Sequence, residues 1–301
     1  MPVAGGRARN LAARVVWQVR ASHWIKNGII ILPAFFAGRM FRLEPAQAAQ
    51  LLLTFLGFSL TASCIYILND VLDVDADRAH PAKRLRPLAA GYFGTRQAAL
   101  IAAPCLVGGV LCALALPRQA GLAMGGYLTL NLLYCFWLKH MPVTDVACIA
   151  AGFVLRLMAG GLVAGVALSH WIVIITFLLM FSVALAKRRD DLVLSTGSEV
   201  AFRSAQAGYT RQFIDTAKSI SFAVTLVAYI LYTVSPEVMA RLGSTQVYIT
   251  ALPVFLGIMR YLQLSIVKES TGDPVRLLFR DPFLIVMVLS WLSIFYWMIY
   301  A

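Results

Sequence analysis

Apolar stretches alternate with short polar segments along the whole chain. The stretches lie near 28–41, 50–69, 98–116, 120–138, 146–167, 171–186, 220–236, 246–262 and 283–300. A helix needs about 20 residues to cross a bilayer, and most of these stretches approach that length. The pattern therefore predicts an all-α membrane protein with nine transmembrane helices in a single domain, residues 1–301. The first stretch is short and contains Pro33, so its ends are the least well defined.

Composition supports a membrane protein and excludes a soluble globular enzyme. Apolar residues make up 60% of the chain, charged residues only 13%, and the mean hydropathy is +0.77. Soluble domains have about 45–50% apolar and about 25% charged residues. The five cysteines all lie within apolar stretches and form no CxxC pair, which supports neither a disulfide framework nor a zinc site.

The basic residues predict the orientation. The chain has 26 Lys and Arg against 14 Asp and Glu, a net charge of +12. With a cytoplasmic N-terminus, the leader 1–27 and the loops 70–97 and 187–219 lie inside. The opposite side then holds only Arg39, Arg42, Arg118 and Arg241. The leader resembles the start of a signal peptide, but no small-residue cleavage site follows, so we expect the first stretch to be retained.

An acidic face continues from the second apolar stretch. At 100° per residue, Asp70, Asp73 and Asp77 point within about 60° of one another, in line with Ser59, Ser63 and Tyr66. Asp75 points away, toward solvent or a neighbouring base. Crowded carboxylates at a membrane boundary repel each other and are usually functional. Mg²⁺, which binds carboxylates together with substrate phosphates, resolves that repulsion. The alternative is a solvated helix end held by Arg78, Lys83 and Arg84.

Two basic segments accompany this face. His80, Lys83, Arg84 and Arg86 lie between Pro81 and Pro87, a rigid turn that suits a diphosphate. His80 by itself fits a structural hydrogen bond as well as a ligand. In the second segment, Lys187 and Arg188 pair with Asp190 and Asp191 at helical spacing, which alone is worth only tenths of a kcal/mol. A plain salt-bridged helix end is one interpretation there.

The second segment also has a surplus of bases that favours a sugar phosphate. Arg189, Arg203 and Arg211 add to the two bases above. Tyr209 fits a phosphate donor or an interfacial anchor equally well. Arg156 lies inside the fifth stretch, where a charge is costly unless it is paired or faces a wet cavity. We expect it to face a cavity and to meet an acid or a phosphate.

The sequence NDVLDVDAD at 69–77, followed by the basic turn, resembles the NDxxDxxxD signature of the UbiA superfamily of intramembrane prenyltransferases. Most members have a second aspartate pair where this chain has KRRDDL at 187–192. The chain looks instead like the decaprenyl-phosphate phosphoribosyltransferase branch, to which four other segments are similar: ASHWIKN at 21–27, HPAKRLRP at 80–87, FRSAQAGYT at 202–210 and GDPVRLLFRDP at 272–282. In that branch, Asp191 stands where Glu is expected.

The resemblance implies nine helices around a central cavity and transfer of phosphoribose from phosphoribosyl diphosphate to a polyprenyl phosphate. It implies a site at the cytoplasmic face of a bacterial inner membrane, in a pathway that makes arabinofuranose donors for the cell envelope. The expected Mg²⁺ ligands are Asn69, Asp70, Asp73 and Asp77, and the expected catalytic carboxylates are Asp77 and Asp191. The expected substrate-binding residues are Lys26, Asn27, Tyr66, His80, Lys83, Arg84, Arg86, Arg156, Lys187, Arg188, Arg203 and Tyr209.

Two alternative functions remain open from the sequence. One is a UbiA-type transfer of a polyprenyl group to an aromatic acceptor, for which a second aspartate pair would be expected. The other is a transporter of an anionic solute, against which the chain shows no inverted repeat of its aspartate motif. No nucleic-acid partner is expected, and a homo-oligomer is left open.

Overall fold

The protein is a bundle of α-helices. The structure is a computed structural model that describes residues 11–80, 83–195, 208–267, 277 and 280–300. The described part contains no strand, which confirms the all-α prediction. The long helices are α3 (Pro45–Leu72), α5 (Thr95–Ala115), α6 (Arg118–Phe136), α7 (Thr144–Val163), α8 (His170–Ser195), α9 (Arg211–Thr233), α11 (Ala251–Ile266) and α13 (Pro282–Tyr300).

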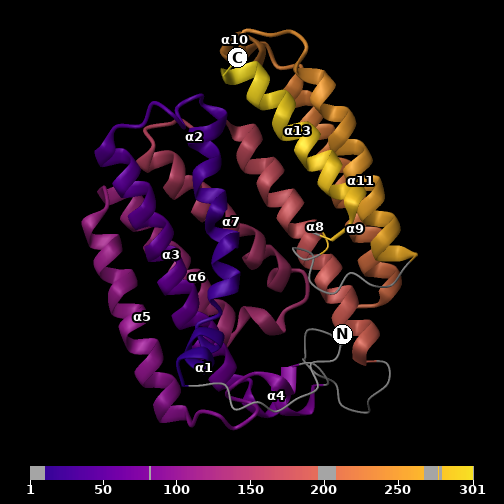
Figure 1. The fold of residues 1–301 in the computed structure, drawn as a ribbon. Coiled ribbons are helices and arrows are strands. Elements are labelled where there is room, and N and C mark those ends of the chain that lie inside the picture. The colour runs from indigo at the N-terminus through magenta and orange to yellow at the C-terminus, as the bar shows by residue number, and fades with distance from the viewer. Residues whose placement is uncertain (1–10, 81–82, 196–207, 268–276, 278–279, 301) are drawn as a thin grey trace.

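The long helices run roughly along a common direction. Helices α3, α5, α6 and α7 form one half of the bundle, and α8, α9, α11 and α13 form the other (Figure 1). Helix α7 packs against α8 and so joins the halves. The short helix α4 (Val74–Ala79) lies at one end of the bundle, and α10 (Pro236–Leu242) lies at the opposite end.

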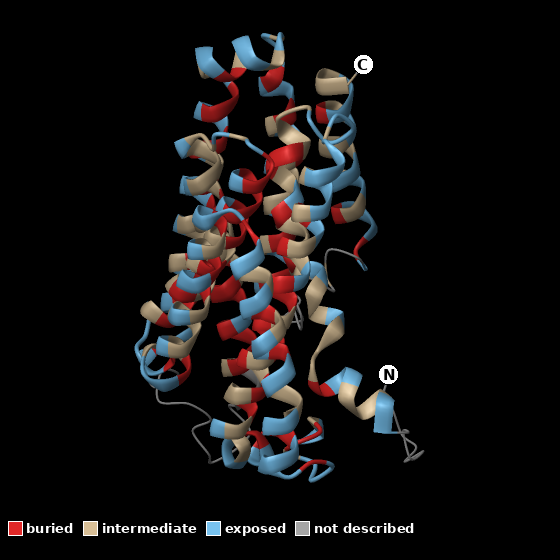
Figure 2. Ribbon diagram, turned by 90° about the vertical axis from the view of Figure 1, so that its left-hand side faces the viewer, coloured by how far each residue is buried: buried red, intermediate tan, exposed pale blue. Residues whose placement is uncertain are grey.

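Buried residues line the inside of the bundle, and exposed residues cover its outer faces (Figure 2). Many of the exposed side chains are large and apolar. Helix α5 shows this most clearly, because Leu100, Leu111 and Leu114 are exposed although the helix is long and apolar. Exposed leucines on this scale are stable in contact with lipid rather than water. The burial pattern therefore agrees with a bundle that sits in a bilayer.

Seven helices of the described chain are long and apolar enough to span a membrane: Pro45–Leu72, Thr95–Ala115, Thr144–Val163, His170–Leu192, Arg211–Thr233, Val247–Ile266 and Pro282–Tyr300. They account for seven of the nine predicted spans. The stretch at 120–138 does form a helix, α6, but Arg118, Gln119 and Asn131 make it more polar. The stretch at 28–41 is not one long helix.

That first stretch folds as two short pieces that lie against α7. A 3₁₀-helix, η1 (Ala21–Ile31), leads into α2 (Leu32–Phe36), where Pro33 occupies the first turn. Eleven residues is long for a 3₁₀-helix, because its hydrogen-bond geometry is poorer than that of an α-helix and makes it less stable in isolation. Packing stabilises it, because the backbone at Ile30 approaches α7 at Gly160 so closely that a Cβ there would overlap the Ile30 carbonyl oxygen.

Helix α3 delivers the aspartate motif to the end of the bundle. It begins with Pro45 in its first turn, and the Gln47 side chain accepts a hydrogen bond from the Glu44 backbone N–H at 3.3 Å. It ends at Leu72 and is followed by Asp73, whose φ of −103° and ψ of 14° lie outside the helical range. Helix α4 starts at the next residue. The motif therefore spans a helix break rather than one continuous helix.

We predict that Gly160→Ala lowers the thermal unfolding midpoint of the purified protein. The added methyl group would push η1 away from α7, and overpacking of this kind costs about 1–3 kcal/mol. The matched control is Gly125→Ala in α6, where a Cβ would meet nothing within 4 Å. Because Ala is the better helix former, the control should keep or slightly raise the midpoint. An equal loss in both variants would contradict the close approach at Ile30.

Candidate active site

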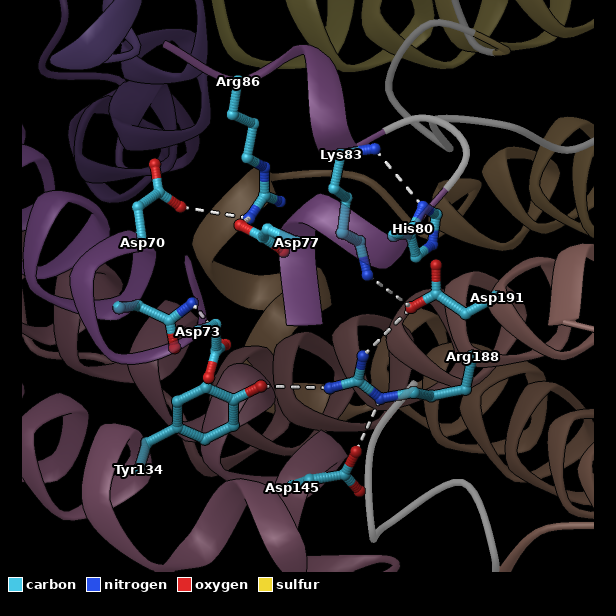
Figure 3. A network of polar contacts seen from close by, with 11 residues as sticks. Asp70, Asp73, Asp77, His80, Lys83, Arg86, Tyr134, Asp145, Arg188 and Asp191 are labelled. Carbon is cyan, nitrogen blue, oxygen red and sulfur yellow. Dashed lines mark hydrogen bonds and ion pairs between the residues drawn. The ribbon is translucent and has the colours of Figure 1, made fainter. Parts of the chain in front are cut away.

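Asp70 is a buried carboxylate at the end of α3, and two bases and one amide from other segments contact it. The Arg20 guanidinium, at the start of η1, forms an ion pair with Asp70 Oδ1. Arg86 NH1 lies 3.0 Å from the same oxygen and 2.5 Å from Asp77 Oδ2, so Arg86 bridges two carboxylates of the motif (Figure 3). Gln18, at the end of α1 (Leu11–Gln18), donates to Asp70 Oδ2 at 3.5 Å.

Asn69 and Asp73 form a second pair in the motif. Asn69 Nδ2 donates to Asp73 Oδ2 at 3.0 Å, and Lys139 Nζ lies 2.6 Å from Asp73 Oδ1. The carbonyl oxygen of the Asn69 side chain is buried and accepts no hydrogen bond from the described residues. Asp75 behaves as predicted, because its side chain is 89% exposed and pairs with Arg78 at 3.0 Å.

A second polar centre lies on α8, next to the first. Arg188 Nε donates to Asp145 Oδ2 at 2.6 Å, NH2 donates to Tyr134 Oη at 3.0 Å, and NH1 lies 3.5 Å from Asp191 Oδ2 (Figure 3). Asp145 is fully buried, so this pair is stabilised only with all its partners in place. Lys83 Nζ, 3.8 Å from Asp191 Oδ2, links the basic turn to α8.

The predicted basic residues divide between buried and exposed positions. The His80 ring is buried, its Nδ1 accepts a hydrogen bond from the Lys83 backbone N–H at 3.3 Å, and burial together with the Lys83 charge lowers its pKa. A neutral His80 suits the structural hydrogen bond weighed above. Arg84 and Lys187 are exposed at the same end of the bundle. Arg203 lies outside the described residues.

Tyr209 contacts Asp145 instead of standing free to meet a phosphate. Its hydroxyl donates to Asp145 Oδ1 at 2.6 Å and accepts the Val143 backbone N–H at 2.6 Å. Burial and the hydrogen bond to Asp145 raise the pKa of Tyr209, which keeps the phenol protonated. In this structure Tyr209 is therefore a positioning residue for Asp145.

The backbone at Val143, whose N–H donates to the Tyr209 hydroxyl, is strained. Val143 has a φ of 67° and a ψ of −45°, and the Thr144 backbone N–H donates to the Pro142 carbonyl at 2.8 Å across it. This is a γ-turn of the rare type, which is costly for a β-branched residue. The turn precedes α7 and sets the direction of the Asp145 side chain. A strained backbone therefore lies two residues from a buried carboxylate.

Arg156 and Asn27 pair with each other deep in the bundle. Arg156 donates to Asn27 Oδ1 and to Tyr127 Oη, both at 2.6 Å, and Asn27 donates to Ser59 Oγ at 2.8 Å. Among the described residues no carboxylate forms an ion pair with Arg156, so the expected acid is replaced by neutral partners and by the Tyr127 ring, 4.3 Å away.

The depth of this pair separates it from the aspartates. Arg156 is eleven residues beyond Asp145 on α7, and Ser59 is eleven residues before Asp70 on α3. At 1.5 Å per residue, both separations are about 16 Å. The structure thus brings the aspartate motif together with the basic turn and with Arg188, but it does not bring Arg156 to them.

Several residues of the site did not stand out in the sequence. Arg20, Lys139, Tyr134 and Asp145 each come from a different segment and reach the two centres only through the packing of the helices. Position was a signal for two of them: Lys139 and Asp145 each lie next to an end of a predicted span, where a charge is solvated unless it is paired. Arg20 and Tyr134 gave no such signal.

The donor set suits Mg²⁺ only after a rearrangement. Within the described chain, no three His, Cys, Asp or Glu side chains are grouped so as to hold a metal ion. The three carboxylates expected to bind Mg²⁺ do not converge, because Arg86 holds Asp70 and Asp77 while Lys139 holds Asp73. The groups are nevertheless all oxygen donors, and the buried carbonyl oxygen of Asn69 lacks a hydrogen-bond partner, as a metal ligand would.

A model of the UbiA prenyltransferase family matches residues 30–288. The decaprenyl-phosphate phosphoribosyltransferase of Mycolicibacterium smegmatis is 30% identical over 96% of this chain and 93% of its own length. The enzyme of that name from Mycobacterium tuberculosis is 30% identical over 94% of this chain and 93% of its own. A UbiA homolog from Archaeoglobus fulgidus bound to GPP and Mg²⁺ has a TM-score of 0.70 at 19% identity, covering 96% of this chain and 100% of the homolog.

We predict that Tyr209→Phe lowers the thermal unfolding midpoint. Loss of the hydroxyl leaves the buried Asp145 carboxylate and the Val143 N–H short of a partner, which costs about 1–3 kcal/mol. The control is Tyr248→Phe, because that side chain is 56% exposed and forms no polar contact within the described residues. If the two variants unfold at the same temperature, Tyr209 does not hold Asp145.

Proposed function

The chain belongs to the UbiA prenyltransferase family, in its decaprenyl-phosphate phosphoribosyltransferase branch, and on that premise we propose that it transfers 5-phosphoribose from phosphoribosyl diphosphate to a polyprenyl phosphate. A phosphate oxygen of the lipid attacks the anomeric carbon of the sugar. The bond from that carbon to the diphosphate oxygen breaks, and diphosphate leaves with the electron pair. The lipid phosphate is already an anion, so the reaction needs no separate base.

The observation that carries this proposal is the basic centre on α8. Buried Arg188, with Lys83 beside Asp191, stands where a prenyltransferase of this superfamily is expected to place a second aspartate pair. Phosphoribosyl diphosphate carries a 5-phosphate in addition to its diphosphate. We assign that phosphate to Arg188, the exposed Lys187 and Arg203, because guanidinium groups bind phosphate oxygens in a fixed geometry.

The diphosphate belongs at the aspartate motif. Asn69, Asp70 and Asp73, with Asp77, are the residues that would hold Mg²⁺, which neutralises charge on the leaving diphosphate when bound. We propose that Arg86 then leaves the carboxylates for the diphosphate oxygens. In the present arrangement Arg86 sits on both Asp70 and Asp77, so it takes the place of a cation there. Arg84 and Lys83 flank the same position.

Asp77 and Asp191 are the carboxylates proposed to stabilise the sugar. Departure of the diphosphate leaves positive charge on the ring, and carboxylates stabilise such oxocarbenium-like states in glycosidases. Both side chains are nearly buried, and each is paired with a base that also binds phosphate in this account. When Arg86 and Lys83 turn to the phosphates, Asp77 and Asp191 each lose one paired base, so more of their negative charge acts on the sugar ring.

The lipid phosphate is assigned to Lys26 and Tyr66. Lys26 is half-buried and, among the described residues, forms no hydrogen bond or ion pair. It lies on η1 between Trp24, which donates to Ser63 Oγ at 3.0 Å, and Asn27. Ser63 precedes Asp70 by seven residues, about 10 Å along α3. The long side chain of Lys26 can cover part of the distance from η1 to the aspartate motif. Asn27 and Arg156 support Lys26 by holding η1 against α7.

The setting of the reaction is part of the same proposal. A nine-span topology with a cytoplasmic N-terminus places the aspartate end of the bundle in the cytoplasm, where a soluble sugar diphosphate is available. The membrane would be a bacterial inner membrane, and the product would supply arabinofuranose donors for the cell envelope.

The experiment is a transfer assay on purified protein. Labelled phosphoribosyl diphosphate, decaprenyl phosphate and Mg²⁺ are incubated with it, and label is measured in the lipid phase. The proposal predicts labelled lipid and released diphosphate in equal amounts. Absence of transfer, together with prenylation of an aromatic acid from a polyprenyl diphosphate, would replace it with the prenyltransferase alternative.

In this assay we predict that Asp73→Asn reduces turnover by at least about 100-fold, because charge stabilisation of a leaving group is often worth several kcal/mol. Asp75→Asn should change turnover less than about twofold, since the side chain is exposed and pairs only at the surface. The two variants differ by two positions and make the same chemical change. Equal losses of turnover in the two variants would contradict the assignment of Asp73, and not Asp75, to the metal site.

A further inference from the structure

A third polar cluster lies between α8, α9 and α11, and the mechanism proposed above uses none of its residues. Arg189 Nε donates to both carboxylate oxygens of Asp215, at 2.9 Å and 3.1 Å. Lys218 Nζ donates to Asp215 Oδ1 at 2.9 Å and to Ser265 Oγ at 2.7 Å. Lys218 and Ser265 are fully buried. One series of polar contacts therefore joins three helices beside the site.

The end of α8 presents this cluster and the site on opposite faces. At 100° per residue, the direction midway between Arg188 and Asp191 differs by about 180° from the direction midway between Arg189 and Asp190. All four side chains are buried. The first pair faces Asp145 and the basic turn (Figure 3), and the second faces α9 and α11. Arg189 belongs to the surplus of bases in the sequence, but it points away from the site.

Lys218 is costly to bury, and stability alone does not explain its presence. A buried ion pair is often no more stable than apolar side chains of similar volume. Apolar contacts allow a helix to rotate by small angles, whereas hydrogen bonds of fixed direction restrict that rotation. Because Asp215 accepts from Arg189 and Lys218 at once, the rotation of α8 is fixed relative to α9. The contact with Ser265 extends this constraint to α11.

The position of Arg188 depends on this rotation, because Arg188 is the neighbour of Arg189 on the same turn. A side chain at the outer edge of a helix lies about 6 Å from its axis, so a rotation of about 20° moves it by about 2 Å. The hydrogen bond from Arg188 to Asp145 is 2.6 Å long and would not survive such a shift. Misplacing a binding group by about 1 Å can reduce catalysis by about 100-fold.

We propose that Asp215 and Lys218 are positioning residues for the donor, because they hold the rotation of α8 at which Arg188 receives the 5-phosphate. The inference rests on the proposed function, which assigns that phosphate to Arg188. Asp215 acts on Arg188 through Arg189, and Lys218 acts through Asp215. Neither is assigned to the diphosphate at the aspartate motif or to the lipid phosphate at Lys26, so their effect is confined to one end of one substrate.

The test separates the two ends of the donor. In the transfer assay, Asp215→Asn should raise the KM for phosphoribosyl diphosphate about tenfold and change the KM for decaprenyl phosphate less than about twofold. Ribose 5-phosphate and inorganic diphosphate, used as competitive inhibitors against the donor, each occupy one end of its site. The inhibition constant of ribose 5-phosphate should rise about tenfold in the variant, and that of diphosphate less than about twofold. An equal rise in both inhibition constants, or a rise in neither, would overturn the inference.

Asp281→Asn is the matched control. Asp281 pairs with Arg260 at 2.7 Å between α11 and the start of α13, so this variant removes the same charge from another interhelical ion pair. Both variants should lower the thermal unfolding midpoint, whereas only Asp215→Asn should change the inhibition constant of ribose 5-phosphate. The same change of that constant in Asp281→Asn would show that loosening of the bundle, and not the rotation of α8, is responsible.

Two further variants test the path through Arg188. Ser265→Ala removes a single hydrogen bond and should raise the inhibition constant of ribose 5-phosphate by about threefold, even if Asp215→Asn does not fold. In an Arg188→Lys background, Asp215→Asn should cause no further rise, because both changes act on one contact. Effects that multiply would contradict the path. Absence of transfer by the wild-type protein would reject the proposed function itself, whereas transfer with unaltered constants in the variants would reject only the positioning role.

Discussion

Carboxylates at the edge of a membrane have to be neutralised, and this requirement organises the end of the bundle where the aspartate motif meets the basic turn. Asp70, Asp73 and Asp77 are matched by Arg20, Lys139 and Arg86. Each base comes from a different segment, so the ion pairs also fix η1, the turn before α7 and the basic turn after α4 around α3. Removing one partner from such a network leaves a buried charge, which costs more than the pair itself stabilises.

The same network suggests how a phosphorylated substrate enters. Three acids balanced by three bases leave no net attraction for a further cation, yet the bases are the groups that bind phosphate best. A diphosphate that arrives with Mg²⁺ brings an anion for the bases and a cation for the acids. In the proposed exchange, each base that leaves a carboxylate pairs with a phosphate oxygen. The second centre follows the same logic, with Asp145 and Asp191 facing Arg188 and Lys83.

Helix periodicity was enough to predict that Asp75 is exposed, because 3.6 residues per turn point it away from Asp70 and Asp73. The break at Asp73 was not predicted, since it depends on the contacts of Lys139 and Asn69. The partners of Asp145 also needed the fold, because Arg188 and Tyr209 lie 43 and 64 residues from it in the sequence. The position of Arg156 in an apolar stretch predicted a buried charge. Its partners, Asn27 and Tyr127, are neutral, and sequence spacing does not identify such partners.

The most direct test is a structure of the protein with Mn²⁺ in place of Mg²⁺ and with phosphoribosyl diphosphate bound. The account predicts a metal peak against the side-chain oxygens of Asn69 and Asp73, with the Arg86 guanidinium on the diphosphate rather than between Asp70 and Asp77. Diphosphate bound elsewhere, or Arg86 still bridging the two carboxylates beside a bound diphosphate, would contradict it.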